Sequence, residues 1–314
     1  MLHCNRKENT VSLLVVGSIA LDTVETPNDK AVDILGGSAT FISSCARYFV
    51  QPVRLVGIVG SDFPKKYLDY LEKSRIDLEG LQIRNGEKTF RWGGKYDEHL
   101  SGRDTLFTEL NAFETFDPVI PEAYRQSDYV CLGNIDPGLQ LRVLDQIRDP
   151  KMIIGDTMNF WIEGKKDDLL KTIERLDVFI LSDSEAQLLA GTKNLVEAGS
   201  KIIDMGSPTV VIKKGEHGAL LMTKDAMFTA PAYPTARVYD PTGAGDAFAG
   251  GFLGWIAKTR DHSFDNLKRA VIYGNVMASF CIEKFSVDAI KDLSETDIEK
   301  RVKTIYELSQ FEPV

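Results

Sequence analysis

The sequence has few residues that could form disulfides or bind zinc. Its 314 residues include four cysteines and four histidines, and no two cysteines have the CxxC spacing. None of the histidines belongs to an HExxH motif, so we expect neither a structural nor a catalytic zinc ion. Widely separated cysteines are typical of reduced thiols in a cytosolic protein. They are Cys4, Cys45, Cys131 and Cys281.

Several nucleotide-binding motifs are also absent. No GxxxxGK[ST] sequence occurs, which excludes a Walker-type phosphate loop. Gly243 and Gly245 do not continue to GxGxxG, because Phe248 occupies the third glycine position, so a dinucleotide site has no support. The HRD and DFG elements of protein kinases are missing as well.

Charge and hydropathy argue against two further kinds of partner. The formal net charge is −9 and no long run of lysine or arginine is present, which argues against nucleic acid. The N-terminus is polar up to Thr10, and the first apolar run, Val11–Val16, is too short for a signal peptide core or a membrane span. We therefore expect a cytoplasmic protein without a membrane partner.

Short apolar runs alternate with helical patterns along the chain. The runs predict strands at Ser12–Val16, Val53–Val59, Tyr129–Leu132, Met152–Gly155, Val178–Leu181 and Val210–Ile212. The patterns predict helices at Ala39–Phe49, Pro64–Ser74, Leu139–Arg148, Asp167–Leu176, Ser184–Ala190, Leu195–Met205, Gly245–Lys258, Phe264–Phe280 and Glu295–Leu308. Such alternation predicts a three-layer α/β fold, in which helices cover both faces of a parallel, Rossmann-like sheet. Because no linker or repeat is visible, we expect residues 1–314 to form a single domain.

Two segments interrupt this alternation and predict a small β-rich lid beside the main sheet. Residues 20–35 form two extended pieces around a turn at 27–29. Residues 81–109 are rich in threonine and aromatic residues, and Asn85-Gly86 favours a tight hairpin turn. The lid could pair with a second subunit to form a homodimer, or the protein could be a monomer. Four side chains of the second segment could touch a substrate or pack within the sheet: Phe90, Arg91, Trp92 and Tyr96.

The strongest chemical signal is the segment Asp240-Pro-Thr-Gly-Ala-Gly-Asp246. An extended stretch enters a glycine-rich turn, and an apolar helix follows it. Amides at a helix start, including that of Ala244, can form an anion site, and Gly243 and Gly245 allow a ligand to approach closely. The carboxylate of Asp246 would sit beside that site. Phosphoryl transfer to an alcohol needs this combination, because amides stabilise the transferring charge while the carboxylate accepts the hydroxyl proton.

The whole segment closely resembles the C-terminal signature of the ribokinase-like, or PfkB-type, carbohydrate kinase family. A second signature agrees with it, since Gly36-Gly37-Ser38-Ala39-Thr40-Phe41 precedes an amphipathic helix. The order of elements also fits from about residue 13 to residue 286. The resemblance implies a ribokinase type of fold, with a lid that covers the substrate and excludes water.

The resemblance implies a set of substrate-binding residues. In the family, the Gly-Gly pair opens the helix that lines the substrate site, and an aspartate after the first strand binds substrate hydroxyls. These roles fall on Asp22, Gly36, Gly37 and Phe41, together with Asp246 as the general base. Phe41 stands where many sugar kinases have asparagine, so the substrate could be less polar than a free sugar.

The resemblance also implies ATP and Mg²⁺ as cofactors, and it leaves open whether a monovalent cation activates. Ser182-Asp183-Ser184-Glu185 resembles the family's Asn-x-x-Glu motif, which assigns Glu185 to magnesium through water, although Ser182 replaces the asparagine. Asp156 and Asn159 follow a predicted strand at the sheet edge where such folds bind ligands. The nucleotide-binding residues implied are Lys213, Gly215, Gly218, Thr242, Gly243, Gly245 and Asn275.

Together these observations predict an ATP-dependent kinase, a phosphotransferase with an alcohol group as acceptor. The γ-phosphoryl group would pass to a hydroxyl of a small sugar-type substrate. Two alternatives stay open, namely a nucleoside such as adenosine as the acceptor, and a regulatory protein that binds a nucleotide or sugar without turnover. Because sensing does not need a base, the presence of Asp246 with both glycines argues against the regulatory alternative.

Overall fold

The computed structural model describes residues 11–100 and 102–310. Nine strands in these ranges form a main sheet: β1 (Leu13–Val16), β4 (Val53–Gly60), β5 (Ile76–Arg84), β8 (Tyr129–Leu132), β9 (Met152–Asp156), β10 (Val178–Ser182), β11 (Thr209–Lys213), β12 (Ala219–Thr223) and β13 (Met227–Ala230). Their order is β13-β12-β11-β10-β9-β8-β1-β4-β5. The strands from β11 to β5 in this order run parallel, β12 pairs antiparallel with β11, and β13 pairs antiparallel with β12.

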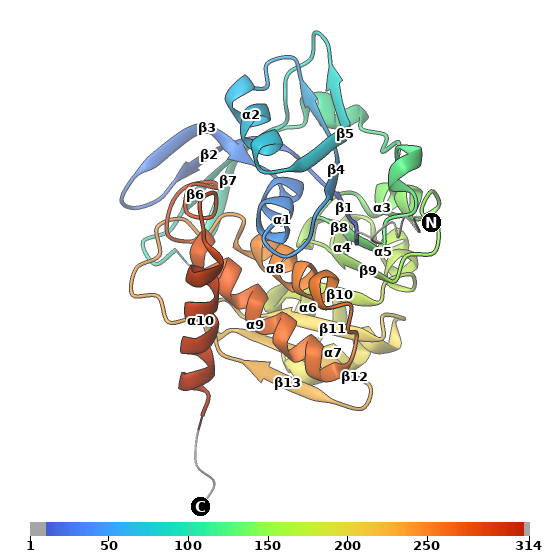
Figure 1. The fold of residues 1–314 in the computed structure, drawn as a ribbon, viewed down its shortest axis with the longest axis vertical. Helices are drawn as coiled ribbons and strands as arrows, with labels where there is room; N and C mark the ends of the chain where they lie inside the picture. The colour runs from blue at the N-terminus through green and yellow to red at the C-terminus, as the bar shows by residue number, and fades with distance from the viewer. Residues whose placement is uncertain (1–10, 101, 311–314) are drawn as a thin grey trace, which may run out of the picture.

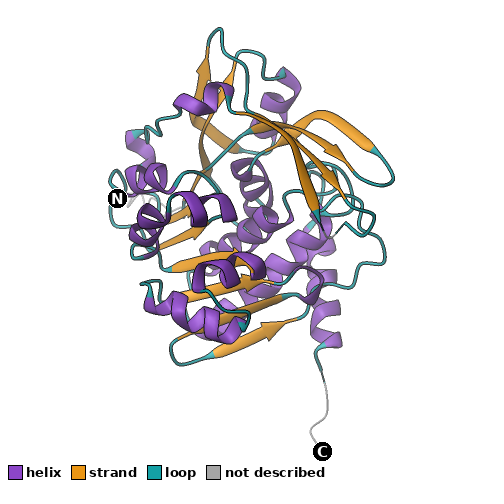
Figure 2. Ribbon diagram, turned by 180° about the vertical axis from the view of Figure 1, so that it is seen from behind, coloured by secondary structure: helices purple, strands orange, loops and turns teal. Residues whose placement is uncertain are grey.

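Helices cover both faces of the main sheet (Figures 1 and 2). The helices are α1 (Ser38–Ala46), α2 (Lys65–Lys73), α3 (Pro137–Leu144), α4 (Asn159–Gly164), α5 (Lys166–Ile173), α6 (Asp183–Ala190), α7 (Leu195–Asp204), α8 (Ala244–Thr259), α9 (Phe264–Cys281) and α10 (Glu295–Leu308), with short 3-10 turns at Asn111–Thr115, Glu122–Tyr124 and Gly215–His217.

Two hydrophobic cores flank the sheet. One contains side chains of α1, α8, α9 and α10, and the other contains side chains of α3, α5, α6 and α7. Strand β1 shows the alternation that produces this arrangement, because Leu13 and Val15 belong to the first core while Leu14 and Val16 belong to the second. The predicted three-layer α/β fold is therefore confirmed, and every predicted strand and helix is present with ends that differ by a few residues.

A second, four-stranded sheet lies beside the main one, and we call it the lid sheet. Its strands are β2 (Ala20–Glu25), β3 (Lys30–Gly36), β6 (Arg91–Tyr96) and β7 (Arg103–Glu109), in the order β3-β2-β6-β7. β2 pairs antiparallel with β3 and parallel with β6, and β6 pairs antiparallel with β7. In Figure 1 these strands are grouped away from the main sheet. The predicted β-rich lid is thus present.

Two predictions about strand pairing need correction. The turn at Asn85-Gly86 does not form a hairpin, because β5 pairs parallel with β4 and leaves β6 to the lid sheet. Residues 81–84 therefore belong to the main sheet rather than to the lid. The sequence analysis also missed the hairpin of β12 and β13, which extends the opposite end of the main sheet.

The described cysteines are compatible with reduced thiols. Cys45, Cys131 and Cys281 are free and buried. Cys4 and the polar stretch up to Thr10 lie outside the described residues. Within the described ranges, none of the helices combines the length and the apolar character that crossing a bilayer requires. That residues 1–314 form a single domain stays a prediction.

Candidate active site

The glycine-rich turn leads directly into α8, as the sequence predicts. Gly243 has a φ of 78°, a left-handed conformation that glycine adopts without a steric penalty. A Cβ atom at this position would lie 2.5 Å from the ring of Phe41, so both the backbone angle and the packing require glycine. Helix α8 then starts at Ala244, with its positive dipole end at the turn. The start of α8 is therefore suited to hold an anion.

The amides of this turn are not equally available. The amide of Ala244 donates to the carbonyl of Pro241 at 3.2 Å. Those of Gly243, Gly245 and Asp246 form no hydrogen bond with any residue in the described part of the chain. The predicted anion site thus has fewer free amides than the sequence suggests, because the Ala244 amide already donates to Pro241.

Asp246 lies in the first turn of α8 and has an unusually high pKa. Burial raises its pKa to about 7, and the nearby carboxylates of Asp156 and Glu185 add to this effect. The positive charges of Lys213 and Arg103 act in the opposite direction. A carboxylate with a pKa near 7 is a stronger base than an ordinary aspartate and is still substantially ionised at neutral pH. Such a group suits the removal of a proton from an alcohol.

The carboxyl ends of β9, β10 and β11 bring a charged cluster to the same edge of the main sheet. Lys213 Nζ donates to Asp156 Oδ2 at 3.1 Å, and both side chains are largely buried. Burial opposes the charge of Lys213, but the carboxylates around it raise its pKa above the ordinary value. A Cβ atom at Gly245 would lie only 3.0 Å from Lys213 Nζ. The ammonium group therefore lies against the anion-binding turn.

Glu185 belongs to the same region, and its position is fixed by the helix that carries it. Ser182 caps α6, because its hydroxyl accepts from the Glu185 amide at 3.3 Å while the Glu185 carboxylate accepts from the Ser182 amide at 2.7 Å. This reciprocal capping box gives Ser182 a structural role at the position where the family pattern has asparagine. Burial raises the pKa of Glu185, and Lys213 lowers it.

Asp22, Gly36 and Gly37 come together where the lid sheet meets α1. A Cβ atom at Gly36 would lie 1.9 Å from Asp22 Oδ2, so only glycine leaves room for this carboxylate. Burial raises the pKa of Asp22 to about 8, the carboxylates of Asp240 and Asp246 add to the shift, and a hydrogen bond from the Gly37 amide opposes it. Two aspartates with raised pKa values thus lie near each other, and their roles on the acceptor side stay predictions.

Phe41 has a different position from the one expected of a substrate contact. Its side chain is 2% exposed and packs beneath Gly243. The ring of Phe41 therefore supports the catalytic turn, because it packs directly against Gly243, the glycine with the left-handed backbone. A direct contact between Phe41 and a substrate stays a prediction.

Three of the predicted nucleotide-binding residues, Gly215, Gly218 and Asn275, lie near the ends of the β12–β13 hairpin. Gly215 and Gly218 both have positive φ angles, 54° and 80°, and shape the connection between β11 and β12. Asn275 on α9 donates to the carbonyl of Pro231, just after β13, at 3.0 Å. The three residues thus lie on elements that meet at one end of the main sheet, which fits a shared nucleotide pocket.

The lid residues divide into two groups. Phe90 stacks on Phe113 at 5.3 Å, and Arg91 forms ion pairs with Asp33 and, at 2.9 Å, with Asp62. These two side chains hold the lid in place. In contrast, Tyr96 and Trp92 lie on the side of the lid that faces α8, as the hydrogen bond between Tyr96 Oη and Thr242 Oγ1 at 3.0 Å shows.

Arg103 lies near the candidate site and was not named in the sequence analysis. Its guanidinium lies over the ring of Trp92, with 4.7 Å from the guanidinium carbon to the ring centre. Its positive charge lowers the pKa values of Asp22, Asp246 and Tyr96, so it faces the acceptor side. The segment around it shows no clear alternation of apolar and polar residues, so hydropathy does not indicate which of its side chains point inward.

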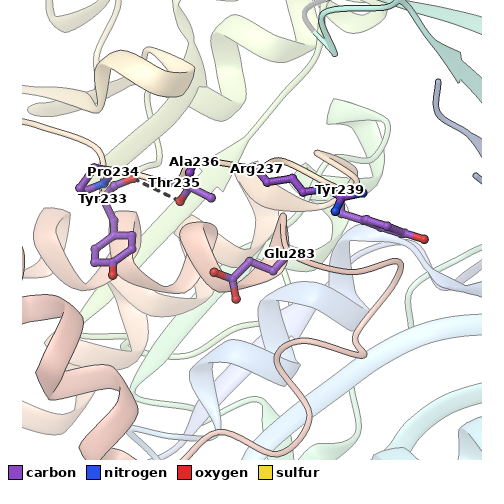
Figure 3. A pocket seen from close by; sticks show the side chains of 7 residues that line it. All are labelled: Tyr233, Pro234, Thr235, Ala236, Arg237, Tyr239 and Glu283. Carbon is purple, nitrogen blue, oxygen red and sulfur yellow. Dashed lines mark hydrogen bonds between the residues drawn. The ribbon is translucent and has the colours of Figure 1, made fainter. Parts of the chain in front are cut away.

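A cavity of about 460 Å³ lies beside the segment that enters the catalytic turn (Figure 3). It is lined by Tyr233, Pro234, Thr235, Ala236, Arg237, Tyr239 and Glu283, none of which is a predicted site residue. Glu283 is paired with Arg301 at 2.6 Å, and the Thr235 hydroxyl donates to the carbonyl of Tyr233. These polar groups have protein partners, so the cavity does not alter the assignment of the site.

The arrangement of the turn, the two aspartates and the lysine cluster agrees with the comparison to known proteins. The model of the pfkB family carbohydrate kinases matches residues 11–292. The chain belongs to the PfkB family. As a PfkB kinase it is an ATP-dependent phosphotransferase that acts on an alcohol group of a sugar or a nucleoside.

Individual relatives of this PfkB kinase include nucleoside kinases. It is 31% identical to the cytidine kinase of Thermococcus kodakarensis over 256 residues, which cover 80% of this chain and 90% of the relative. It is 32% identical to the aminoimidazole riboside kinase of Salmonella typhimurium over 298 residues, covering 85% and 88%. The solved nucleoside kinase of Methanocaldococcus jannaschii, a member of the ribokinase family, has a TM-score of 0.76 at 22% identity and covers 93% of this chain and 98% of its own. That likeness confirms the ribokinase type of fold.

The residues at the PfkB site fit a nucleotide whose metal ion is held through water. In the described ranges, no group of three or more histidine, cysteine, aspartate or glutamate side chains forms a protein cage for a metal. The carboxylates of Asp156 and Glu185 nevertheless flank the anion-binding turn beside Lys213. Magnesium in kinases usually keeps several waters and binds through one or two carboxylates and the substrate phosphates, which matches this donor set.

Proposed function

We propose that this PfkB kinase transfers the γ-phosphoryl group of ATP to a hydroxyl group of a nucleoside. The observation that supports it best is the position of the catalytic turn. On one side of the start of α8 lie the acceptor residues around Asp22, and on the other lies the phosphate side around Lys213. Asp246, with its pKa of about 7, stands between them.

Two features favour a nucleoside over a free sugar as the acceptor. One relative of high coverage is a cytidine kinase, at 31% identity over 80% of this chain. The lid also places the indole of Trp92 opposite Asp22 in the strand register, so an aromatic surface adjoins the group that would bind hydroxyls. A free sugar, which the sequence alone favours, is the second candidate, because Asp22 and the glycines at 36 and 37 would serve either acceptor.

In the proposed reaction, Asp22 accepts hydrogen bonds from hydroxyl groups of the acceptor and orients it. Asp246 removes the proton from the attacking hydroxyl. The free amides of Gly243, Gly245 and Asp246, together with Lys213, stabilise the charge on the transferring phosphoryl group. Magnesium bound with ATP would neutralise phosphate charge, and Glu185 would bind the ion through an intervening water.

A monovalent cation is proposed as an additional activator. Asp240 Oδ2 is buried and has no hydrogen-bond partner in the described part of the chain, although Oδ1 accepts from the Thr242 amide at 2.8 Å. A buried carboxylate oxygen without a partner is costly, and a cation would offset that cost. Because Asp240 begins the catalytic turn, a cation there would stabilise the conformation of the anion-binding amides.

We also propose that the lid sheet forms a contact between two copies of this chain. All seven residues of the edge strand β7 are exposed, and Leu106 is 49% exposed. An exposed edge strand has unpaired backbone groups that can bind a second strand. Sedimentation or light scattering would report a dimer for the wild type, and a monomer for Leu106→Asp if the contact involves β7. A monomeric wild type would contradict the proposal.

The cytoplasmic location stays a prediction.

The catalytic assignment is tested by assaying purified protein with Mg-ATP against cytidine, adenosine and ribose. We expect acceptor-dependent release of ADP, which falls by about 10²–10⁴-fold in Asp246→Asn because the general base is lost. Asp265→Asn is a matched control, since Asp265 occupies the first turn of α9 and is exposed. Wild-type turnover in Asp246→Asn would show that Asp246 is not the base. Turnover with ribose but with no nucleoside would favour the second candidate.

A further inference from the structure

The lid sheet presents a distinct set of side chains to the catalytic turn. Residues that alternate along a strand share one face, and residues directly opposite each other on paired strands share it too. Trp92 and Tyr96 therefore lie on one face of β6, where Trp92 is opposite Asp22 on β2 and Tyr96 is opposite Arg103 on β7. The hydrogen bond from Tyr96 to Thr242 identifies this face as the one directed at the active site.

Trp92 can take its position only because Gly94 has no side chain. A Cβ atom at Gly94 would lie 2.0 Å from the six-membered ring of Trp92, so the ring rests against the backbone of β6. The guanidinium of Arg103 lies over the same ring, 4.7 Å from its centre. Arg103 is exposed and has no carboxylate within ion-pair distance in the described part of the chain. Indole and guanidinium thus form a stacked pair next to Asp22.

The opposite face of the lid carries a counterpart that serves as an internal control. A Cβ atom at Gly93 would lie 2.4 Å from the ring of Phe107, so this ring also rests against a glycine of β6. Phe107 is opposite Gly93 in the register and is 37% exposed. It belongs to the face that points away from Asp22. Each face of the lid therefore has one aromatic ring that rests against a glycine of β6, and of these two rings only that of Trp92 faces the site.

We propose that the Trp92–Arg103 pair is the surface on which the planar base of the acceptor nucleoside stacks. This inference rests on the proposed function. Guanidinium groups and aromatic rings both stack on nucleobases, and the guanidinium is planar and delocalised. Asp22, on the adjacent strand, would hold the hydroxyl groups of the sugar while the pair holds the base. A free sugar has no planar part and would leave the pair unused.

The test compares Trp92→Leu with Phe107→Leu, because each removes one aromatic ring from the lid. We expect Trp92→Leu to raise the KM for cytidine on the order of 10-fold, within the range measured for base–aromatic stacking. The KM for ATP should stay unchanged, and Phe107→Leu should leave both values at the wild-type level. Trp92→Phe, which keeps a planar ring, should restore most of the affinity for cytidine. Thermal unfolding of each variant verifies that it is folded.

A second variant separates the effect of the planar guanidinium group of Arg103 from the effect of its positive charge. Arg103→Lys keeps the positive charge but loses the planar group, so we expect a higher KM for cytidine and an unchanged pH profile of kcat. An unchanged KM for cytidine would mean that Arg103 acts through its charge alone, which lysine keeps, and would overturn its part in the stack.

The possible failures are distinguishable. If the wild type phosphorylates free sugars and no nucleoside, the proposed function is wrong and the stacking surface fails with it. If the wild type phosphorylates cytidine but Trp92→Leu and Phe107→Leu have the same KM for it, the proposed function stands and the stacking surface alone is refuted.

Discussion

The pKa of Asp246 leads to a prediction about pH that can be checked in detail. The carboxylate must be ionised to accept a proton, and its pKa is raised from 3.8 to about 7 by burial and by the neighbouring carboxylates. Of those carboxylates, Asp156 raises the pKa of Asp246 the most. The variant Asp156→Asn removes its negative charge and leaves Lys213 free to interact more closely with Asp246. Both changes favour the ionised form, so the pKa of Asp246 should fall.

The expected size of the effect follows from the ionised fraction. With a pKa near 7, about half of Asp246 is ionised at pH 7, about a tenth at pH 6 and about a hundredth at pH 5. The value of kcat/KM should therefore fall about tenfold for each pH unit below 7. An ordinary aspartate would show no such loss above about pH 5. In Asp156→Asn the midpoint should move to lower pH by about one unit, the size typical of a nearby charge.

The assay is the release of ADP at limiting acceptor from pH 5 to pH 9, measured on the wild type and on Asp156→Asn. ATP itself titrates equally in both series, so the difference between the two profiles reports on the protein. Lys213→Gln removes a positive charge and should move the midpoint to higher pH. A profile that is flat from pH 5 to pH 8, or equal midpoints in all three proteins, would refute the assignment of the titrating base to Asp246.

Three further predictions concern the turn and the acceptor aspartate. Asp22→Asn should raise the midpoint of thermal unfolding at pH 7 but not at pH 4. A carboxyl group with a pKa of about 8 in the folded state destabilises the fold only at pH values where the same group is ionised in the unfolded chain. An equal effect at both pH values would contradict this. Gly243→Ala should lower kcat and destabilise the protein by at least about 1–2 kcal/mol, the cost of a left-handed non-glycine residue, and unchanged unfolding would show that the turn adapts. Potassium should stimulate the wild type and not Asp240→Asn, measured as ADP release with and without the salt, whereas equal stimulation would place the cation elsewhere.

The sequence predicted the catalytic turn well because its signal is local. Gly243 and Asp246 are a few residues apart, so the positive φ, the helix start and the carboxylate all follow from one short segment. The alternation of strands and helices likewise predicted the main sheet. Residues assembled from distant segments were harder to predict. Nothing near Lys213 indicates its ion pair with Asp156, which lies 57 positions earlier in the chain.

The errors at the lid have the same origin. Asn85-Gly86 has strong turn propensity, but the pairing of β5 with β4 depends on backbone groups far from the turn. Arg103 lies in a strand whose residues are all exposed, so hydropathy could not indicate which face is directed at Asp22. Only the register of β6 and β7 indicates that Arg103 lies on the face of the lid directed at Asp22.

The lid and the phosphate-binding turn are joined by two tyrosine hydroxyls. Tyr239 donates to Asp29 at the tip of the β2–β3 hairpin at 2.6 Å, and Tyr96 bonds Thr242 at 3.0 Å. These contacts lie on either side of Asp240. Any movement that lifted the lid would have to break both of them, so the backbone from Tyr239 to Thr242 is tied to the position of the lid.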